Sequence, residues 1–144
     1  MYGEAILRTK CASVEPGYPE LDQLILNMYE TMHNAEGCGL AAPQVNLPFR
    51  LFVVEDVVTG FKECFINAEI FFYSKDVWVA EEGCLSIPGL SAPVKRAYKI
   101  KIRYRDAGWQ LRERIFKGPV ARIIQHEYDH IEGKLYIDYL KRSS

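Results

Sequence analysis

The stretch "IIQHEYDHIEG", residues 123–133, places His126, Glu127 and His130 in the pattern H-E-x-x-H. On a helix, four residues advance by about 400°, so the two imidazoles leave nearly the same face, about 6 Å apart along the axis. Two metal ligands need this arrangement, and Glu127, turned by about 100° from His126, is placed to hold a water at the metal. The rest of the helix is mostly apolar, and polar side chains buried there need partners. The stretch therefore predicts a metal-binding helix.

Prolines and a glycine mark the ends of this helix and the start of another. Pro119 suits the first helical position and Gly133 suits the C-terminal cap, which predicts a helix from Pro119 to Glu132. Apolar residues at helical period, with a proline near the start and acidic residues in the first turn, predict an N-terminal helix from Pro19 to Ala35.

The segment between the two helices is rich in β-branched and aromatic residues, partly in alternation with polar ones, which predicts strands. The predicted strands are "RLFVVEDV" (50–57), "FKECFINAEIFFYS" (61–74), "DVWVAEE" (76–82), "AYKIKIRYRD" (97–106) and "WQLRERIF" (109–116). "DAG" (106–108) predicts a hairpin turn, and the Gly- and Ala-rich "EGCGLAAPQVNLPFR" (36–50) predicts a loop. This order indicates an α+β fold in which mainly antiparallel sheets wrap around a central C-terminal helix, with one N-terminal helix.

Length and charge narrow the choice further. The chain has 144 residues, enough for a single domain that spans residues 1–144. Its formal net charge of −1 gives no indication of a nucleic-acid or anionic-membrane partner. No apolar run reaches membrane-spanning length, and "MYGEAILRTK" (1–10) lacks the apolar core of a signal peptide, so we expect a cytoplasmic protein.

Two histidines leave a catalytic metal site incomplete, because such sites normally take three protein ligands and a water. A third histidine placed as in metzincins would fall on Tyr136, and no glutamate follows Glu132, so the missing ligand lies upstream. We favour Cys84 in "EEGCLSIPG" (81–89), because a thiolate and two imidazoles suit Zn²⁺ or Fe²⁺. Gly83 beside it lets the backbone approach a ligand closely. The competing candidates are Cys11, Cys38, Cys64 and His33, and we expect each cysteine other than the ligand to be reduced and buried.

Three stretches together resemble the motifs of peptide deformylases: "GCGLAAPQ" (37–44), "EGCLS" (82–86) and "QHEYDH" (125–130). They occur in the order and approximate spacing of that family, and the resemblance extends from "ILRTKCASV" (6–14) to "GKLYIDYL" (133–140). It implies that one divalent metal ion is bound by Cys84, His126 and His130, with water in the fourth position. The family uses Fe²⁺ natively, and Zn²⁺, Ni²⁺ or Co²⁺ can take its place. The implied reaction removes the formyl group from the N-terminal formyl-methionine of new polypeptides and releases formate.

The resemblance also implies roles for other residues. Glu127 is the general base and then the acid that protonates the leaving amine, while the Gln44 side-chain amide and the Leu85 backbone N–H stabilise the oxyanion. Substrate contacts are implied for Gly37, Cys38, Gly39, Leu40, Gly83, Ile87 and Tyr128, and Gly39 pairs with the substrate backbone like an added strand.

Some of these substrate contacts have alternatives. Cys38 and Tyr128 stand where the family often has aliphatic residues, and core packing explains Ile87 equally well. Behind the cysteine loop, Glu82 and Arg96 resemble a buried acid–arginine pair, and Asp129 is expected to orient a histidine or cap the neighbouring backbone.

The chain ends at "DYLKRSS" (138–144) without the long C-terminal helix of many bacterial deformylases, which makes it similar to short forms encoded by bacteriophages or to truncated cellular relatives. We therefore expect it in the bacterial cytoplasm, including that of a phage-infected host, as a monomer acting on N-formylmethionyl nascent peptides. A weak ribosome contact is expected, with no direct nucleic-acid partner and no membrane. The alternatives are an inactive module that binds blocked N-terminal peptides, a peptidase acting on internal bonds, and a purely structural metal site.

Overall fold

The computed structural model describes residues 10–84 and 87–134; for residues 83, 84 and 87–92 the description covers the backbone alone. The helices are α1 (Leu21–Asn34), the 3₁₀ helix η2 (Ala42–Val45) and α2 (Gly118–Ile131). The strands are β1 (Gly39–Ala41), β2 (Leu51–Asp56), β3 (Phe61–Tyr73), β4 (Val77–Cys84), β5 (Ile87–Ala97), β6 (Lys99–Arg105) and β7 (Leu111–Lys117).

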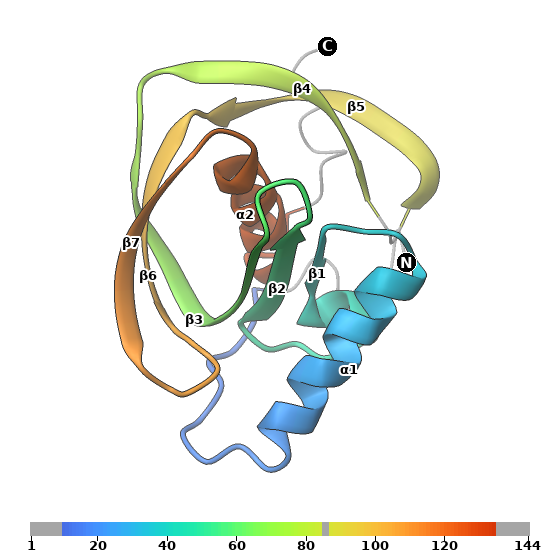
Figure 1. Cartoon of the computed structure of the whole chain (residues 1–144), viewed down its shortest axis with the longest axis vertical. Helices are drawn as coiled ribbons and strands as arrows, with labels where there is room; N and C mark the ends of the chain where they lie inside the picture. The colour runs from blue at the N-terminus through green and yellow to red at the C-terminus, as the bar shows by residue number, and fades with distance from the viewer. Residues whose placement is uncertain (1–9, 85–86, 135–144) are drawn as a thin grey trace.

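The strands form two antiparallel sheets around α2. Five of them pair in the order β1-β2-β3-β6-β7, and β4 pairs with β5 in a second sheet. Figure 1 shows α2 in the middle of the molecule, surrounded by strands, with α1 outside on the side of β1 and β2. This arrangement confirms the predicted fold class. None of the described helices is long and apolar enough to cross a membrane.

The five-stranded sheet separates two apolar clusters, and β2 contributes to both. The cluster under α2 is built with Ala121, Ile124 and Ile131 of that helix, and the cluster under α1 with Ile25, Met28 and Met32 of that helix. Phe52 and Val54 face the cluster under α2, while Leu51 and Val53 face the cluster under α1. All four are fully buried, which explains why this strand reads as a continuous apolar run rather than an alternating one. Each such side chain contributes about 1.5–3 kcal/mol on burial. The sheet is thus packed on both faces, with α2 against one of them.

The ends of α2 lie where the sequence predicted them, within a residue. Gly118 has φ +65° and precedes Pro119 in the first turn. At the other end Gly133 has φ +77°, and the Lys134 N–H bonds to the Asp129 carbonyl at 2.8 Å. This is a left-handed cap of the kind that glycine favours. The predicted 106–108 turn is also confirmed, because it joins the paired strands β6 and β7.

Two strands were not predicted. The segment 36–50, predicted as a loop, contains β1 and η2, because β1 pairs along the edge of β2 and is buried there despite its weak strand propensity. Strand β5 was missed because Pro88, Gly89 and Pro93 argue against a strand interior. It pairs with β4 in a sheet of two strands, so β5 is an edge strand, the kind of strand in which proline is tolerated.

Candidate active site

The two histidines of α2 lie side by side, as the H-E-x-x-H spacing predicted. The ring centroids of His126 and His130 are 5.2 Å apart. Burial, reinforced by the neighbouring His126, lowers the pKa of His130 to about 3. His130 is therefore a neutral imidazole at physiological pH, the form that binds metals.

The carboxylate of Glu82 fixes the orientation of His126. Its Oε1 lies 2.7 Å from His126 Nδ1. Burial alone would raise the pKa of Glu82, but hydrogen bonds from His126 and Arg96 outweigh it and lower the pKa to about 2. Because the carboxylate is ionised and can only accept, Nδ1 carries the proton and Nε2 is left as the ligand atom.

Three cationic or protonated side chains converge on Glu82. Arg96 donates from Nε to Oε2 at 3.0 Å and from Nη2 to Oε1 at 2.8 Å, so the expected buried acid–arginine pair is present. Arg96 also donates from Nη1 to Asp129 Oδ2 at 2.6 Å. Asp129, expected to orient a histidine or cap the backbone, is thus part of this ion-pair group, while the carboxylate that orients His126 is Glu82.

Arg122 completes this group and was missed in the sequence. It is buried, and its Nη1 bonds to Glu82 Oε2 and, at 3.0 Å, to the Val94 carbonyl. Its Nη2 donates to the Trp78 carbonyl at 2.6 Å, and its guanidinium lies 4.4 Å from the Trp78 ring centroid. Arg122 therefore ties both strands of the β4–β5 sheet to α2. Its position one helical turn before His126 is the feature of the sequence from which it could have been predicted.

Glu127 is buried with an incompletely satisfied carboxyl group. Its Oε1 has no hydrogen-bond partner among the described residues. Burial raises its pKa to about 7, although the neighbouring His126 opposes the rise. A carboxyl group that titrates near neutrality can both accept and release a proton during a reaction.

Glycine at position 39 leaves room for this carboxyl group. A Cβ on Gly39 would lie 2.6 Å from Glu127 Oε2 and 2.8 Å from its Cγ, closer than real Cβ contacts. Gly39 also begins β1, which lies at the end of the strand order and pairs with β2 alone in the described part of the chain. The outer edge of β1 can thus accept an extended peptide next to Glu127.

The other residues of the 37–44 motif lie around this edge. Gln44 Oε1 accepts the Ala41 N–H at 2.9 Å, which turns its NH₂ group the opposite way as a donor. Leu40 is buried in the cluster under α1, so its backbone rather than its side chain borders the edge. The Gly37 N–H bonds to the Met32 carbonyl at 2.9 Å at the end of α1. Cys38 is exposed, which corrects the expectation that it is buried.

Several predicted site residues remain untested. Cys84 ends β4 and Ile87 begins β5, but their side chains, and all of Leu85, lie outside the described residues. Gly83 pairs with Ser91 just before Cys84. Tyr128 packs against the cluster under α2, with the Arg50 guanidinium 5.7 Å from its ring centroid.

Three of the other candidates for the third metal ligand, Cys64, Cys11 and His33, have different structural environments. Cys64 is buried in the cluster under α1, as predicted, and Cys11 is buried in the cluster under α2. His33 is exposed and bonds to Glu55. Among the described side chains, no three potential ligands gather at one point.

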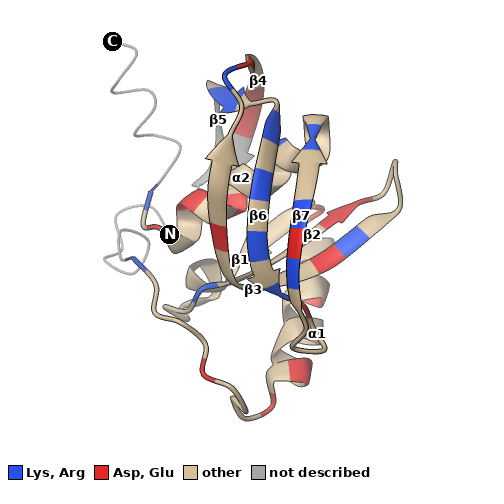
Figure 2. Ribbon diagram, turned by 90° about the vertical axis from the view of Figure 1, so that its left-hand side faces the viewer, with Lys and Arg blue, Asp and Glu red and all other residues tan. Residues whose placement is uncertain are grey.

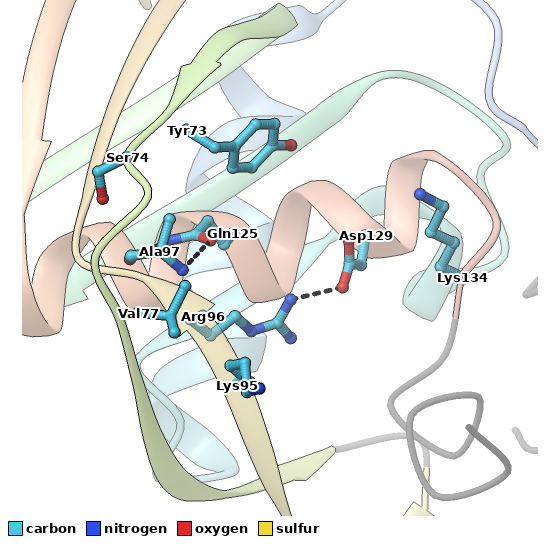
Figure 3. A pocket seen from close by; sticks show the side chains of 9 residues that line it. All are labelled: Tyr73, Ser74, Val77, Lys95, Arg96, Ala97, Gln125, Asp129 and Lys134. Atoms are coloured by element: carbon cyan, nitrogen blue, oxygen red, sulfur yellow. Dashed lines mark hydrogen bonds and ion pairs between the residues drawn. The ribbon is translucent and has the colours of Figure 1, made fainter. Parts of the chain in front are cut away.

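A separate hollow of about 360 Å³ lies behind the ion-pair group (Figure 3). Gln125 and Asp129 of α2 line it together with Arg96 and Ala97 of β5. Gln125 Nε2 donates to the Ala97 carbonyl at 2.9 Å, and its Oε1 accepts the Ala97 N–H at 3.2 Å. These bonds hold β5 against α2, and among the described side chains that line the hollow there is neither His126 nor His130.

Known proteins match this chain along its length. A family model described as polypeptide deformylase matches residues 1–144. The peptide deformylase of Flavobacterium johnsoniae is 45% identical in an alignment that covers 95% of this chain and 78% of that protein. A probable peptide deformylase from Synechococcus phage S-SSM7 superposes with a TM-score of 0.90 at 35% identity, covering 96% of this chain and 95% of the phage chain. The Met-Ala-Ser-bound class I type b peptide deformylase of Acinetobacter baumannii superposes with a TM-score of 0.88 at 34% identity, covering 94% of this chain and 92% of the Acinetobacter chain.

Proposed function

The chain belongs to the polypeptide deformylase family, and we propose that it removes the formyl group from the N-terminal formyl-methionine of new polypeptides and releases formate. The observation that carries this proposal is the buried Glu127 carboxyl group, which adjoins both the histidine pair and β1, whose outer edge pairs with no other described strand. An inactive module that binds blocked peptides has no need for a carboxyl group tuned to titrate near neutrality.

Peptide deformylases are metalloenzymes, and the residues here fit a metal ion. We propose that Cys84, His126 and His130 hold one divalent ion, with Fe²⁺ as the native metal and Zn²⁺, Ni²⁺ or Co²⁺ as substitutes. The hydrogen bond from His126 Nδ1 to Glu82 supports this assignment, since metal-binding histidines are commonly oriented in this way. When bound, the metal acts as a Lewis acid that makes water a nucleophile near neutral pH.

Glu127 moves the proton in the proposed reaction. It accepts a proton from the water that attacks the formyl carbon, and it delivers this proton to the amine when the C–N bond breaks. The Gln44 NH₂ group and the Leu85 N–H donate to the formyl oxygen as it gains negative charge. Formate and a peptide with a free N-terminus are the products.

The substrate lies along β1 in this proposal. Its backbone pairs with the edge at Gly39, and Cys38, Gly83, Ile87 and Tyr128 are the proposed neighbours of the methionine side chain. The Met-Ala-Ser bound to the Acinetobacter relative has the composition of a deformylated product, which supports a peptide beginning with methionine.

We propose that the enzyme works as a monomer in the cytoplasm of bacteria, on nascent chains, with a weak ribosome contact. The bacterial relatives and the phage deformylase support this setting, which includes a phage-infected cell.

The test is formate release from formyl-Met-Ala-Ser by protein prepared anaerobically, with metal measured on the same sample. We expect release that stops with a chelator and about one metal per chain. A fully metallated protein that binds the peptide without releasing formate would refute the hydrolase proposal in favour of the binding module.

A further inference from the structure

We propose that one end of the outer face of the five-stranded sheet binds single-stranded RNA. This basic face consists of Lys99 and Lys101 on β6, Lys117 on β7, and Phe71 and Phe72 on β3. The proposal concerns a surface remote from Glu127 and does not depend on the deformylase reaction.

Strand alternation places the cations of this face on its solvent side. In β6, Ile100 and Ile102 are fully buried in the cluster under α2, so Lys99 and Lys101 point the opposite way. Lys117 lies directly opposite Lys99 in the β6–β7 register. Figure 2 shows the resulting line of basic residues along β6, with β7 beside it.

The three lysines have no acidic partner within the part of the chain that the structure describes. Among the described residues none of them forms a salt bridge, whereas Arg103, further along β6, pairs with Glu113 at 2.7 Å. On β3, the exposed Glu69 likewise lies opposite Arg103 rather than opposite a lysine. Like charges directly opposite each other destabilise a sheet, and the Lys99–Lys117 pair is such a case. An anion bound between them would remove this repulsion.

Exposed aromatic rings accompany the lysines. Phe71 is 49% exposed and Phe72 is 39% exposed. Strand alternation is interrupted here by a register shift between Ile70 and Phe72, and both rings contact outward cations of β6, with the Arg103 guanidinium 5.2 Å from the Phe71 ring centroid. Lys101 Nζ is 4.9 Å from the Phe72 ring centroid, and Lys99 Nζ is 5.8 Å from it. A base that replaces a lysine over this ring would stack on it and release the ammonium group for a phosphate. Rings for bases next to cations for phosphates are what single-stranded nucleic acids require.

The net charge of the whole chain does not by itself indicate this site. It is −1, from which we expected no nucleic-acid partner. Whole-chain charge cannot reveal that three unpaired lysines lie together. An anionic membrane would also attract lysines, but it offers no flat rings for Phe71 and Phe72 to stack on.

The experiment measures the fluorescence anisotropy of a labelled, unstructured 20-nucleotide RNA with metal-loaded, full-length protein over a range of salt concentrations. The test variant is K99Q/K101Q/K117Q, and the matched control K10Q/K62Q/K134Q removes the same charge from other parts of the surface. A second variant, F71A/F72A, removes the rings without changing charge. Deformylation of formyl-Met-Ala-Ser and the Tm of each variant show that it is folded.

We expect the test variant to bind at least tenfold more weakly than wild type in about 50 mM salt, and its log K against log salt to be shallower by about 2. The control should stay within twofold of wild type, and F71A/F72A should lose at least fivefold. Equal losses in both lysine variants, no loss in F71A/F72A, or wild-type binding to phosphatidylserine vesicles without binding to RNA would each overturn the proposal.

Discussion

Replacing Gly39 by alanine should slow deformylation about a hundredfold while leaving the metal in place. The new Cβ would lie 2.6 Å from Glu127 Oε2, 2.8 Å from Cγ and 2.9 Å from Cδ. Ordinary van der Waals contact begins at 3.4 Å, so the carboxyl group must retreat by about 0.8 Å. Because Cγ is also too close, rotation of the carboxylate alone cannot relieve the clash.

The size of the effect follows from this displacement. Misplacing a catalytic group by about 1 Å can cost about a hundredfold in rate, which corresponds to about 2.7 kcal/mol in the barrier. Overpacking also lowers the free energy of unfolding by about 1–3 kcal/mol. Backbone strain adds nothing, since Gly39 is a strand residue whose φ is not positive.

The assay is kcat/KM for formyl-Met-Ala-Ser, with metal content and thermal unfolding measured on the same sample. Gly108→Ala is the matched control, because its Cβ would meet only Asp106 Oδ1 at an ordinary 3.5 Å. A fully metallated Gly39→Ala protein within threefold of the wild-type rate would refute the reasoning, since Glu127 would then not need its present position.

Four further outcomes follow from the same site. Glu127→Gln should keep the metal and lose at least a hundredfold in kcat, and a metal-loaded variant with wild-type turnover would exclude Glu127 as the base. In the metal-free protein, burial raises the pKa of Glu127 to about 7, so between pH 4.5 and 7 the folded state holds a proton that the unfolded state has lost. The free energy of unfolding of wild type, relative to that of Glu127→Gln, should therefore fall by about 3 kcal/mol over this pH range. A difference that stays constant with pH in denaturant titrations would contradict this. Arg122→Met should lower the affinity for the metal about 10- to 100-fold, measured by competition titration, whereas Arg112→Met, at an exposed arginine, should leave it unchanged. Equal affinities of the two variants would show that Arg122 does not support the metal site. Fe²⁺-loaded enzyme should lose activity in air, because both metal and thiolate oxidise, and full activity after days in air would count against an iron–thiolate site.

Local sequence signals were sufficient for both long helices and five of the strands. Pro119 and Gly133 gave the ends of α2, and the alternation in "YKIKIRY" gave β6 and its buried face. The geometry of His126 and His130 followed from helical spacing alone. These features depend on residues within a few positions of one another, which is the range over which a single sequence carries reliable physical information.

The convergence on Glu82 depends on contacts that no local pattern contains. Glu82 is separated in sequence from Arg96 by 14 residues, from Arg122 by 40 and from His126 by 44. Only the packing of the β4–β5 sheet on α2 brings them together. The resemblance supplied the Glu82–Arg96 pair, but neither Arg122 nor the hydrogen bond that His126 donates to Glu82. A helix that is otherwise apolar does offer a clue, because a buried arginine in it requires acceptors nearby.

The failure to predict β1 has a functional cause. A strand made of larger β-branched residues would have been recognisable, but a side chain at position 39 would occupy the space of the Glu127 carboxyl group. The glycine that admits the base therefore also removes the strand signal, and β1 forms because β2 supplies its hydrogen bonds and burial. In this chain the segment with the weakest local preference is the one that the proposed chemistry needs to be small, so its structure has to come from its neighbours.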